Sequence, residues 1–444
     1  MHTTDQVPIR FPDSADDSPV SMLVAGDCIL SREAGDTPIG PDLTERVKSA
    51  DLSLVNLEAP VTDAPPPLAK SGPHKHSAPQ TAQVLAAAGF DGVTLANNHI
   101  MDYGPGGLSQ TVQACEEADL DHVGAGDSTE AAFDPIVHRI QGCDISILNL
   151  CEREFGEATD RSAGTAWLGH RSADAHIEAA SEYSDVVVVI VHGGTEYAPF
   201  PPPHLQDRFR EVIDRGADLV VGHHPHVPQG WERYGDGLIV YSLGNFLFEQ
   251  SKRPSTQWGT SLGVEFGTDG IQHAELLITE QQRGHVNLVE PSEVDSYHEH
   301  LTRLSEITAD ADALTAHWQA QAVKLFHLRY TDWLATGVGT NVTQWPSHPS
   351  RLLHPGGHWD TEERGSDLLV LLNLIRNDSH RAVLQSALEV ETGTAPDYRT
   401  PSVTATVDEL LRRTDDKYPD GNSPTVGKAL DVVIDRILPV ELRN

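Results

Sequence analysis

The sequence predicts an α/β protein in which residues 21–290 form one compact domain with two β-sheets. Two observations support this prediction. Between residues 21 and 224, short apolar runs alternate with helical patterns, which is typical of parallel strands joined by helical crossovers. From 227 to 290, short apolar runs follow one another with only turn residues between them, which indicates consecutive strands that extend the sheet system as an antiparallel tail.

The elements of the first half follow in order along the chain. The expected strands lie at 21–26, 51–58, 92–98, 144–150, 185–194 and 218–224. The expected helices lie at 41–50, 79–90, 105–118, 171–182 and 203–217. The strand at 185–194 has the sequence DVVVVIVHGG, and its uniform β-branched run predicts that both of its faces are covered. Gly89 is expected to end the second helix, and Pro105 suits the first turn of the third.

The composition changes near residue 291. Helical periodicity occupies 293–336 and 366–391, an irregular stretch rich in Pro, Gly and His lies at 345–358, and a further helix is expected at 425–437. The chain therefore divides into a flexible, polar N-terminal segment (1–20), an α/β domain (21–290) and a helical C-terminal extension (291–444). The pattern leaves open whether the extension is a separate domain or packs onto the first one.

The net charge is −35, from 66 Asp and Glu against 31 Lys and Arg, and it disfavours nucleic acid and anionic membranes as partners. Because the acidic residues are spread along the chain, we favour a halophilic surface on which salt screens the self-repulsion. An acidic partner-binding surface is the alternative. No run approaches the roughly 20 apolar residues of a membrane helix. The first twenty residues lack the features of a signal peptide, so we expect a cytoplasmic protein.

Five polar clusters end or follow predicted strands. They are Gly26–Asp27, Asn56–Leu57–Glu58, Asn97–Asn98–His99 with Asp102, His192–Gly193–Gly194 with Glu196, and His223–His224–Pro225–His226. Ligands of open α/β sheets bind beyond the carboxyl ends of the strands, so these clusters are expected to converge in space. Carboxylate, amide and imidazole groups together suit a divalent ion such as Mn, Zn or Fe. Taken alone, each cluster also fits a turn, a cap or a hydrogen-bonded core histidine.

Several segments together resemble the CapA family of capsule (poly-gamma-glutamate) synthesis proteins. They are VAGDCILSR, DLSLVNLEAPVTD, KSGP, AGFDGVTLANNHIMDYGPGGLSQT, VHGGTEYAPFPPPHLQ, GADLVVGHHPHVPQGWERY and LIVYSLGNFLF, and they cover about residues 21–250 in family order. That family is similar to the calcineurin-like metallophosphatases. The resemblance implies a metallophosphatase-type α/β/β/α sandwich with a metal centre, usually of two divalent ions (Mn, Fe or Zn), at one edge.

The resemblance also implies a role for each matching residue. The implied metal ligands are Asp27, Glu58, Asn98, His192, His224 and His226, and His99 is the implied catalytic residue, which faces the leaving oxygen. The chain departs from the superfamily pattern at two positions. Ile29 stands where a histidine ligand is usual, so that ligand is missing or supplied elsewhere, and Glu58 stands where most members have a bridging aspartate.

Five further residues are site candidates with less specific roles. Glu196 is characteristic of the family and is expected to orient a ligand or bind substrate. Lys70 is a candidate for contact with an anionic substrate, although we favour a solvated lysine in a polar loop. Asn56 and His223 lie next to implied ligands, and His223 receives no role of its own. Asn245 belongs to the family segment YSLGNF, which is expected to pack below the site.

Three functions fit this pattern. The first is a metal-dependent hydrolase that cleaves a phosphoester or polymer linkage in an anionic small molecule or polymer. The second is a non-catalytic accessory or assembly protein of a capsule machine with a structural metal site, and the third is a polymer-binding module. The Asn98–His99 pair favours the hydrolase because a structural site has no need of a proton donor. Ile29 favours the accessory protein, and the negative charge disfavours the polymer-binding module.

Overall fold

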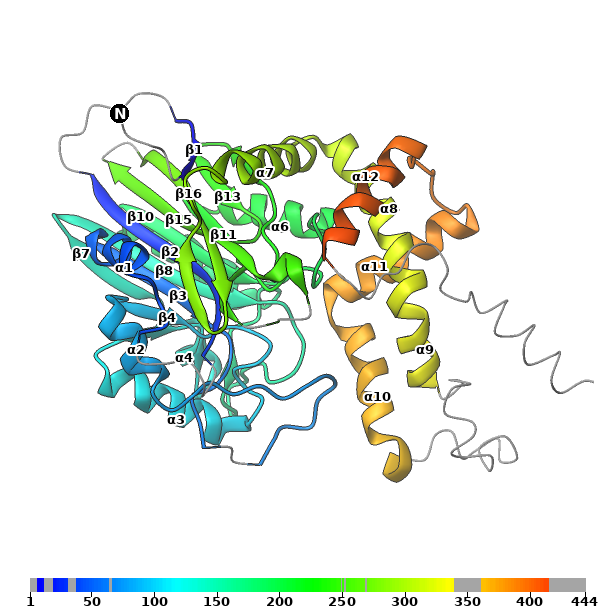
Figure 1. The fold of residues 1–444 in the computed structure, drawn as a ribbon. Helices are drawn as coiled ribbons and strands as arrows, with labels where there is room; N and C mark the ends of the chain where they lie inside the picture. The colour runs from blue at the N-terminus through cyan, green and yellow to red at the C-terminus, as the bar shows by residue number, and fades with distance from the viewer. Residues whose placement is uncertain are drawn as a thin grey trace, which may run out of the picture.

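Two β-sheets lie face to face at the centre of the protein, and helices cover the outer face of each sheet (Figure 1). The computed structural model describes residues 6–11, 19–30, 37–63, 66–248, 250, 253–267, 270–338 and 361–414. The layers follow the order α/β/β/α, and further helices stand beside them at one end. The predicted fold class, a two-sheet α/β sandwich with a mainly helical C-terminal extension, is confirmed.

The first sheet contains nine strands among the described residues, in the order β1-β16-β15-β2-β3-β4-β5, with β14 beside β2 and β17 beside β16. Their bounds are β1 Gln6–Ile9, β2 Val20–Ile29, β3 Leu52–Leu57, β4 Gly92–Thr94, β5 Asp121–Val123, β14 Asn245–Phe248, β15 Trp258–Gly267, β16 Gly270–Gln282 and β17 His285–Leu288. Strands β2 to β5 run parallel. The long β15–β16 hairpin continues the sheet antiparallel, so the sheet combines both predicted halves of the domain.

The second sheet contains six strands in the described part of the chain, in the order β12-β13-β11-β10-β8-β7. Their bounds are β7 Ile136–Ile140, β8 Cys143–Cys151, β10 Val186–His192, β11 Leu219–His223, β12 Trp231–Tyr234 and β13 Gly237–Val240. The four central strands are parallel, and the two edge strands are antiparallel. A short ribbon of β6 (Ala125–Gly126) and β9 (Gly164–Thr165) lies apart from both sheets.

Alternation along strand β10 shows how the layers form. Val186, Val188 and Ile190 belong to the core between the sheets, whereas Val187, Val189 and Val191 belong to the core under the outer helices. Both faces of this strand are therefore buried, as its β-branched run predicts. Helices α1 Pro41–Ser49, α2 Thr81–Ala88 and α3 Gly104–Glu117 cover the first sheet, and α4 Thr129–Phe133, α5 Arg171–Tyr183 and α6 Pro203–Asp214 cover the second.

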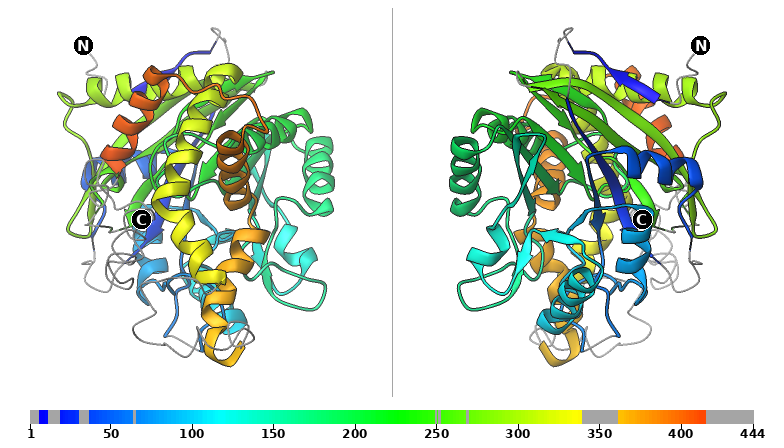
Figure 2. Two further views of the ribbon diagram at one scale, coloured as in Figure 1. Left: turned by 90° about the vertical axis from the view of Figure 1, so that its right-hand side faces the viewer. Right: turned by 90° about the vertical axis from the view of Figure 1, so that its left-hand side faces the viewer.

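The C-terminal helices pack directly onto the sandwich (Figure 2). They are α7 Val294–Ala309, α8 Ala311–Leu325, a π-helical turn Phe326–Tyr330, α9 Thr331–Val338, α10 Thr361–Arg376, α11 Asp378–Thr392 and α12 Pro401–Thr414. Ala198 and Phe200, from the loop after β10, lie inside the apolar clusters of these helices. The side chain of Gln321 bonds both the backbone nitrogen and the backbone oxygen of Phe200, at 3.2 and 3.0 Å. The extension and the sandwich thus share apolar clusters. Of the two arrangements that the sequence left open, the helices pack onto the first domain.

Three details differ from the sequence-based expectations. Residues 6–9 form a strand within the segment 1–20 that was expected to be flexible, because Val7 and Ile9 pair with β16 and enter the core between the sheets. Strand β4 ends at Thr94, well before residue 98, because the residues after it leave the sheet as a loop. The tail from 227 to 290 is not wholly antiparallel, since β13 and β14 join their neighbours β11 and β2 in parallel.

Two further expectations, the irregular stretch at 345–358 and the helix at 425–437, lie outside the described residues. Within the described ranges, none of the helices is both long enough and apolar enough to cross a bilayer.

Candidate metal centre

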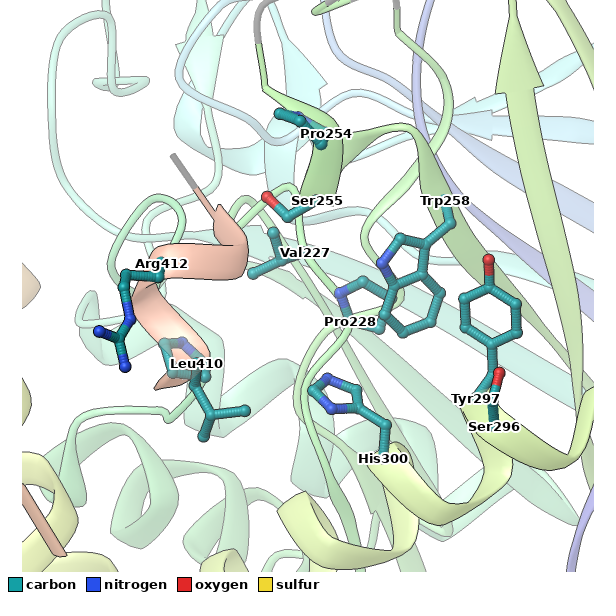
Figure 3. Close-up of a pocket in the computed structure, with 11 residues that line it drawn as sticks. Val227, Pro228, Pro254, Ser255, Trp258, Ser296, Tyr297, His300, Leu410 and Arg412 are labelled. Carbon is teal, nitrogen blue, oxygen red and sulfur yellow. The ribbon is translucent and has the colours of Figure 1, made fainter. Parts of the chain in front are cut away.

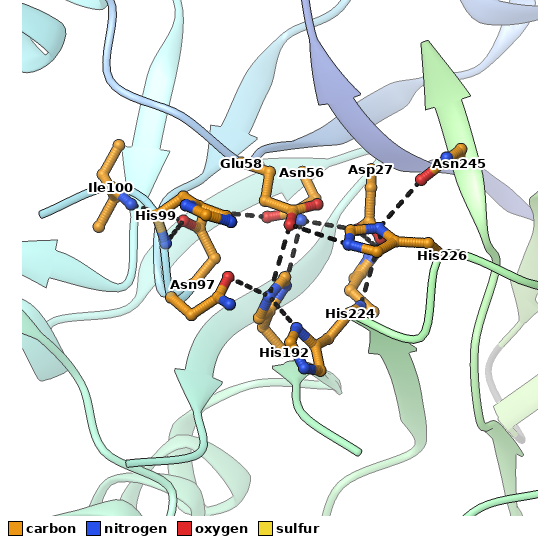
Figure 4. A network of polar contacts seen from close by, with 12 residues as sticks. Asp27, Asn56, Glu58, Asn97, His99, Ile100, His192, His224, His226 and Asn245 are labelled. Carbon is orange, nitrogen blue, oxygen red and sulfur yellow. Dashed lines mark hydrogen bonds and ion pairs between the residues drawn. The ribbon is translucent and has the colours of Figure 1, made fainter. Parts of the chain in front are cut away.

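The polar clusters of the sequence meet where the carboxyl ends of the two sheets lie together (Figure 4). The first sheet contributes Asp27 near the end of β2, Asn56 near the end of β3, Glu58 directly after β3, and Asn245 at the start of β14. The second sheet contributes His192 at the end of β10 and His223 at the end of β11. Most of these side chains reach the centre because their strands end at or near this edge, so the sheet topology itself builds the site.

Asp27 is fully buried and lies among three of these groups. Its Oδ1 accepts a hydrogen bond from Asn56 Nδ2 at 2.8 Å and lies 3.1 Å from His223 Nδ1, while its Oδ2 lies 3.1 Å from His226 Nδ1. Burial alone would raise the pKa of Asp27, but the hydrogen bonds from His223 and His226 outweigh burial and hold the pKa well below its usual range. Asp27 is therefore an ionised carboxylate.

Glu58 is the exception in this network. Its side chain is fully buried, and neither carboxylate oxygen has a hydrogen-bond partner among the described residues. The nearest imidazole nitrogens are His226 Nε2 at 3.6 Å and His192 Nε2 at 4.0 Å from Oε1. Burial and the charge of Asp27 raise the pKa of Glu58 well above its usual value. A buried carboxylate without partners is strongly destabilising, so the residues present fit a cation at this position.

Two groups of ligand atoms converge around Glu58. One consists of Glu58, His192 and His224, the other of Asp27, Glu58 and His226, and within each group the ligand atoms lie within 4.8 Å of one another. Asn98 Oδ1 lies 3.1 Å from His192 Nε2, beside the first group. The six residues expected as ligands are therefore brought together, and Glu58 belongs to both groups. These carboxylate, imidazole and amide groups are of the kind that would hold a divalent ion.

The loop that carries two of the imidazoles has an uncommon backbone. His224 and His226 have φ values of 98° and 59°, in the left-handed region that side chains with a Cβ rarely adopt. Strain of this kind persists where the surrounding structure fixes it, and it concentrates at functional sites. The backbone is also closely packed beside Asp27. A Cβ at Gly26 would lie 2.2 Å from the backbone oxygen of Gly244. Glycine at position 26 allows β2 and β14 to meet there.

A second buried network holds His99. His99 Nδ1 lies 2.7 Å from Asp102 Oδ2, and Lys70 forms an ion pair with the other oxygen of Asp102 and donates to the backbone oxygen of Asn98 at 3.2 Å. Burial and the positive charge of Lys70 lower the pKa of His99 to about 4. His99 is thus neutral near pH 7, and the hydrogen bond from Nδ1 to Asp102 leaves Nε2 as the proton-accepting nitrogen.

The expectation that Lys70 is solvated is wrong. Its side chain is only 3% exposed, because the loop that carries it folds over Asp102, which is 0% exposed and neutralises the charge. Its neighbour Lys75 also contacts this aspartate, through a backbone N–H that donates to Oδ2 at 2.6 Å. Lys70 therefore lies beside His99 inside the protein.

The metal centre opens into a cleft of about 260 Å³. The sandwich lines it with Lys70, Lys75, Asn98, His99, Glu154, Glu196, Tyr197, His224 and His226, and the extension with Trp333, Val370, Asn373, Leu374 and His380. Glu196 lies in this wall, 3.8 Å from Arg329 of the extension. Burial opposes the ionisation of Glu196, but His224, His226 and Arg329 lower its pKa to about 2. Glu196 is thus a charged group of the cleft and lies outside both groups of ligand atoms.

Sequence patterns missed the contribution of the extension. Trp333, Asn373 and His380 lie on three different helices, and no local motif marks them. His223, which received no role, lies against Asp27, and Asn245 Oδ1 lies 3.1 Å from His226 Nδ1. Both residues therefore position side chains of the site.

A second cavity, of about 490 Å³, lies between β15 and the helices α7 and α12 (Figure 3). Trp258, Tyr297 and His300 form an aromatic wall on one side of it. Among the described residues that line this cavity, His300 is the single imidazole and no carboxylate is present. The cavity therefore does not offer a metal site comparable to the first.

Comparison with known proteins agrees with the sequence motifs. The family model described as bacterial capsule synthesis protein PGA_cap matches residues 21–250. The chain belongs to this family. The resemblance to CapA proteins is confirmed: the capsule biosynthesis protein CapA of Bacillus anthracis is 32% identical over 247 residues, which are 52% of this chain and 60% of that protein. The PGA biosynthesis protein CapA of Bacillus subtilis is 34% identical over 208 residues, 46% of this chain and 54% of that one.

A more distant relative is named "Probable polyglutamine synthesis accessory protein" in Mycobacterium tuberculosis, at 28% identity over 213 residues, 45% of this chain and 56% of that one. The matches thus span 60% or less of the length of these PGA_cap relatives. Among solved structures, a phosphatase from Mycoplasma pneumoniae has a TM-score of 0.39 at 16% identity, covering 60% of this chain and 96% of that one. A 5'-nucleotidase from Candida albicans has a TM-score of 0.36 at 9% identity, covering 67% and 56%. These structural similarities are weak.

Proposed function

We propose that this chain is a metal-dependent hydrolase of capsule polymer metabolism that cleaves a phosphoester or a polymer linkage. The observation that carries the proposal is the carboxylate of Glu58, which is buried, lacks a hydrogen-bond partner among the described residues and belongs to both groups of ligand atoms. Such a carboxylate is destabilising by itself and is neutralised by divalent cations. The names of the two Bacillus relatives support the link to capsule synthesis.

The chemistry follows from which residues surround the cleft. Two divalent ions held by Asp27, Glu58, Asn98 and the three imidazoles would lower the pKa of a bound water and neutralise an anionic group. Lys75 lines the cleft and would attract a phosphate or carboxylate, whereas the charge of Lys70 is paired with Asp102. His99 moves a proton at Nε2, because Nδ1 is committed to Asp102. Asp102 fixes the orientation and the tautomer of that ring.

The alternative is a non-catalytic accessory protein with a structural metal site. Two observations favour it: the name of the mycobacterial relative, and Ile29 in place of a usual histidine ligand. The buried Lys70–Asp102–His99 network argues for the hydrolase, because a structural site has no use for a neutral imidazole with a free Nε2 next to a cleft. We expect the substrate to be an anionic small molecule or polymer, and we do not expect nucleic acid.

The test starts with elemental analysis of the purified protein, followed by turnover assays with Mn²⁺ added. The substrates are p-nitrophenyl phosphate, bis-p-nitrophenyl phosphate and poly-gamma-glutamate. Bound metal together with turnover that Glu58→Gln abolishes is the expected result. Bound metal without turnover on any of the three substrates favours the accessory protein, and a protein that binds no divalent metal contradicts both forms of the proposal.

A further inference from the structure

The outer wall of the metal cleft comes from a part of the chain that the family model does not cover. Trp333 on α9, Asn373 on α10 and His380 on α11 line the cleft together with His99 and His224. All three lie beyond residue 250, where the family match ends. Any ligand that fills the cleft in front of the metal centre therefore also touches the extension.

Asn373 is the residue of this wall that indicates a bound ligand. The residue is only 9% exposed, and its Oδ1 makes no hydrogen bond with any described residue. Its neighbours Leu372 and Ile375 on the same helix face outward, with 43% and 59% exposed. A buried acceptor without a partner is unfavourable, so this oxygen is free to accept a hydrogen bond from a donor on a bound molecule.

The metal-centre side and the extension side of the cleft offer different chemical groups. Lys75 lies beside the Asp102–His99 pair, where an oxyanion would also meet the metal centre. The extension contributes Asn373, whose Oδ1 is buried and has no hydrogen-bond partner among the described residues, and Glu154 adds a carboxylate to the lining. Burial raises the pKa of Glu154 to about 7, although Lys70 and a hydrogen bond from Asn373 oppose this, so an ammonium group nearby would favour its ionised form. The metal-centre side of the cleft is thus suited to an oxyanion, and the extension side to a hydrogen-bond donor.

The wall is fixed in position relative to the metal centre. Glu152, which is 6% exposed, accepts hydrogen bonds from Ser379 Oγ at 2.8 Å and from the backbone nitrogen of Gly194 at 3.3 Å. Ser379 precedes His380 of the wall, and Gly194 follows the ligand His192 by two residues. An ion pair of 2.7 Å between Arg376 and Glu157 adds a second anchor. The distance between the wall and the metal centre is therefore set by the fold.

We propose that the cleft selects a small oxyanion whose organic part carries a hydrogen-bond donor, an amine or a hydroxyl, and that Asn373 is the specificity-determining residue. The proposal rests on the proposed metal site, which would hold the oxyanion. The volume of about 260 Å³ is near the lower end of ligand pockets, which are typically about 300–1,000 Å³. The cleft therefore accepts a small molecule or the terminal unit of a polymer.

Three phosphonates of matched size, which cannot be hydrolysed at the phosphorus–carbon bond, provide the test. Mn²⁺-loaded full-length protein is titrated calorimetrically with 2-aminoethylphosphonate, 2-hydroxyethylphosphonate and propylphosphonate. One or both of the donor-bearing compounds should bind about tenfold more tightly than propylphosphonate, the size of effect expected for one buried hydrogen bond. The comparison of the amino and hydroxyl compounds identifies the donor.

Asn373→Leu should abolish the preference for donor-bearing compounds and keep the affinity for propylphosphonate. Leu372→Ala, on the outward face of the same helix, should keep the preference and the affinity of the wild type. Circular dichroism and the metal-to-protein ratio verify that each variant is folded and loaded. Equal binding of all three compounds by the wild type, no phosphonate binding by loaded protein, or an unchanged preference in Asn373→Leu would each overturn the inference. A wild type that binds no metal would instead contradict the proposed function.

Discussion

Lys70 and Asp102 form an ion pair whose side chains are both buried, with 3% and 0% of their surfaces exposed. Removal of one partner leaves a charge in the interior without compensation, so Lys70→Ala should lower the free energy of unfolding by about 3–5 kcal/mol. Urea denaturation measures this change. Lys324→Ala serves as the matched control, because its ion pair with Asp408 is 39% and 34% exposed and should contribute only about 0–1 kcal/mol. Similar losses for the two variants would show that Lys70 is solvated after all.

Glu58→Gln should act in opposite directions with and without metal. In metal-free protein the substitution removes a carboxyl group whose ionisation is opposed by burial and by the charge of Asp27, so the free energy of unfolding should rise. With Mn²⁺ present the wild type gains stability from binding and the variant gains much less. Thermal melts in EDTA and in Mn²⁺, together with metal-to-protein ratios, measure both effects. A variant that binds Mn²⁺ as fully as the wild type would remove Glu58 from the ligand set.

His99→Ala separates proton transfer from metal binding. His99 belongs to neither group of ligand atoms, so the variant should keep its metal and lose about 100- to 10,000-fold in turnover on any substrate that the wild type cleaves. His226→Ala, by contrast, should lower the metal-to-protein ratio because it removes a ligand. Elemental analysis and kcat, measured on the same preparations, distinguish the two variants. If His99→Ala loses metal as completely as His226→Ala does, His99 is a ligand.

Glu154 should make stability depend on pH between about 4.5 and 7. Its pKa rises from 4.5 to about 7 on folding, mainly through burial, so the folded state holds this proton more tightly than the unfolded state. A raised carboxyl pKa stabilises the fold fully below pH 4.5 and loses that contribution as the pH rises toward 7. Urea denaturation of metal-free protein at pH 4.5 and 7.5 should therefore show a larger loss for the wild type than for Glu154→Gln. Equal losses would contradict the raised pKa.

Salt should stabilise the protein. With a net charge of −35, self-repulsion disfavours the compact state, and screening relieves it. The melting temperature should therefore rise between low and molar KCl, and sorbitol at the same osmolality controls for general solute effects. An unchanged melting temperature would speak against a surface adapted to salt and in favour of an acidic partner-binding surface.

The sequence predicted the metal centre better than its surroundings, for a physical reason. Asp27, His192 and His223 end strands whose apolar runs are visible locally, and parallel strands bring their carboxyl ends together. The burial of Lys70 could not be predicted, because it depends on a loop that folds over Asp102. The position of Asn373 depends on packing between α10 and a sandwich that ends far earlier in the chain, and such long-range packing leaves no periodic pattern.

The shared core of Ala198 and Phe200 has a consequence for how this protein and its relatives can exchange parts. These two residues lie in the sandwich part of the chain, but their side chains pack among the C-terminal helices. A chimera that receives the helices of another family member while keeping its own loop would bury mismatched apolar surfaces beside the metal ligands. The loop around residues 195–200 and the helices after residue 293 therefore form a single module, and both would have to be transplanted together to alter the cleft.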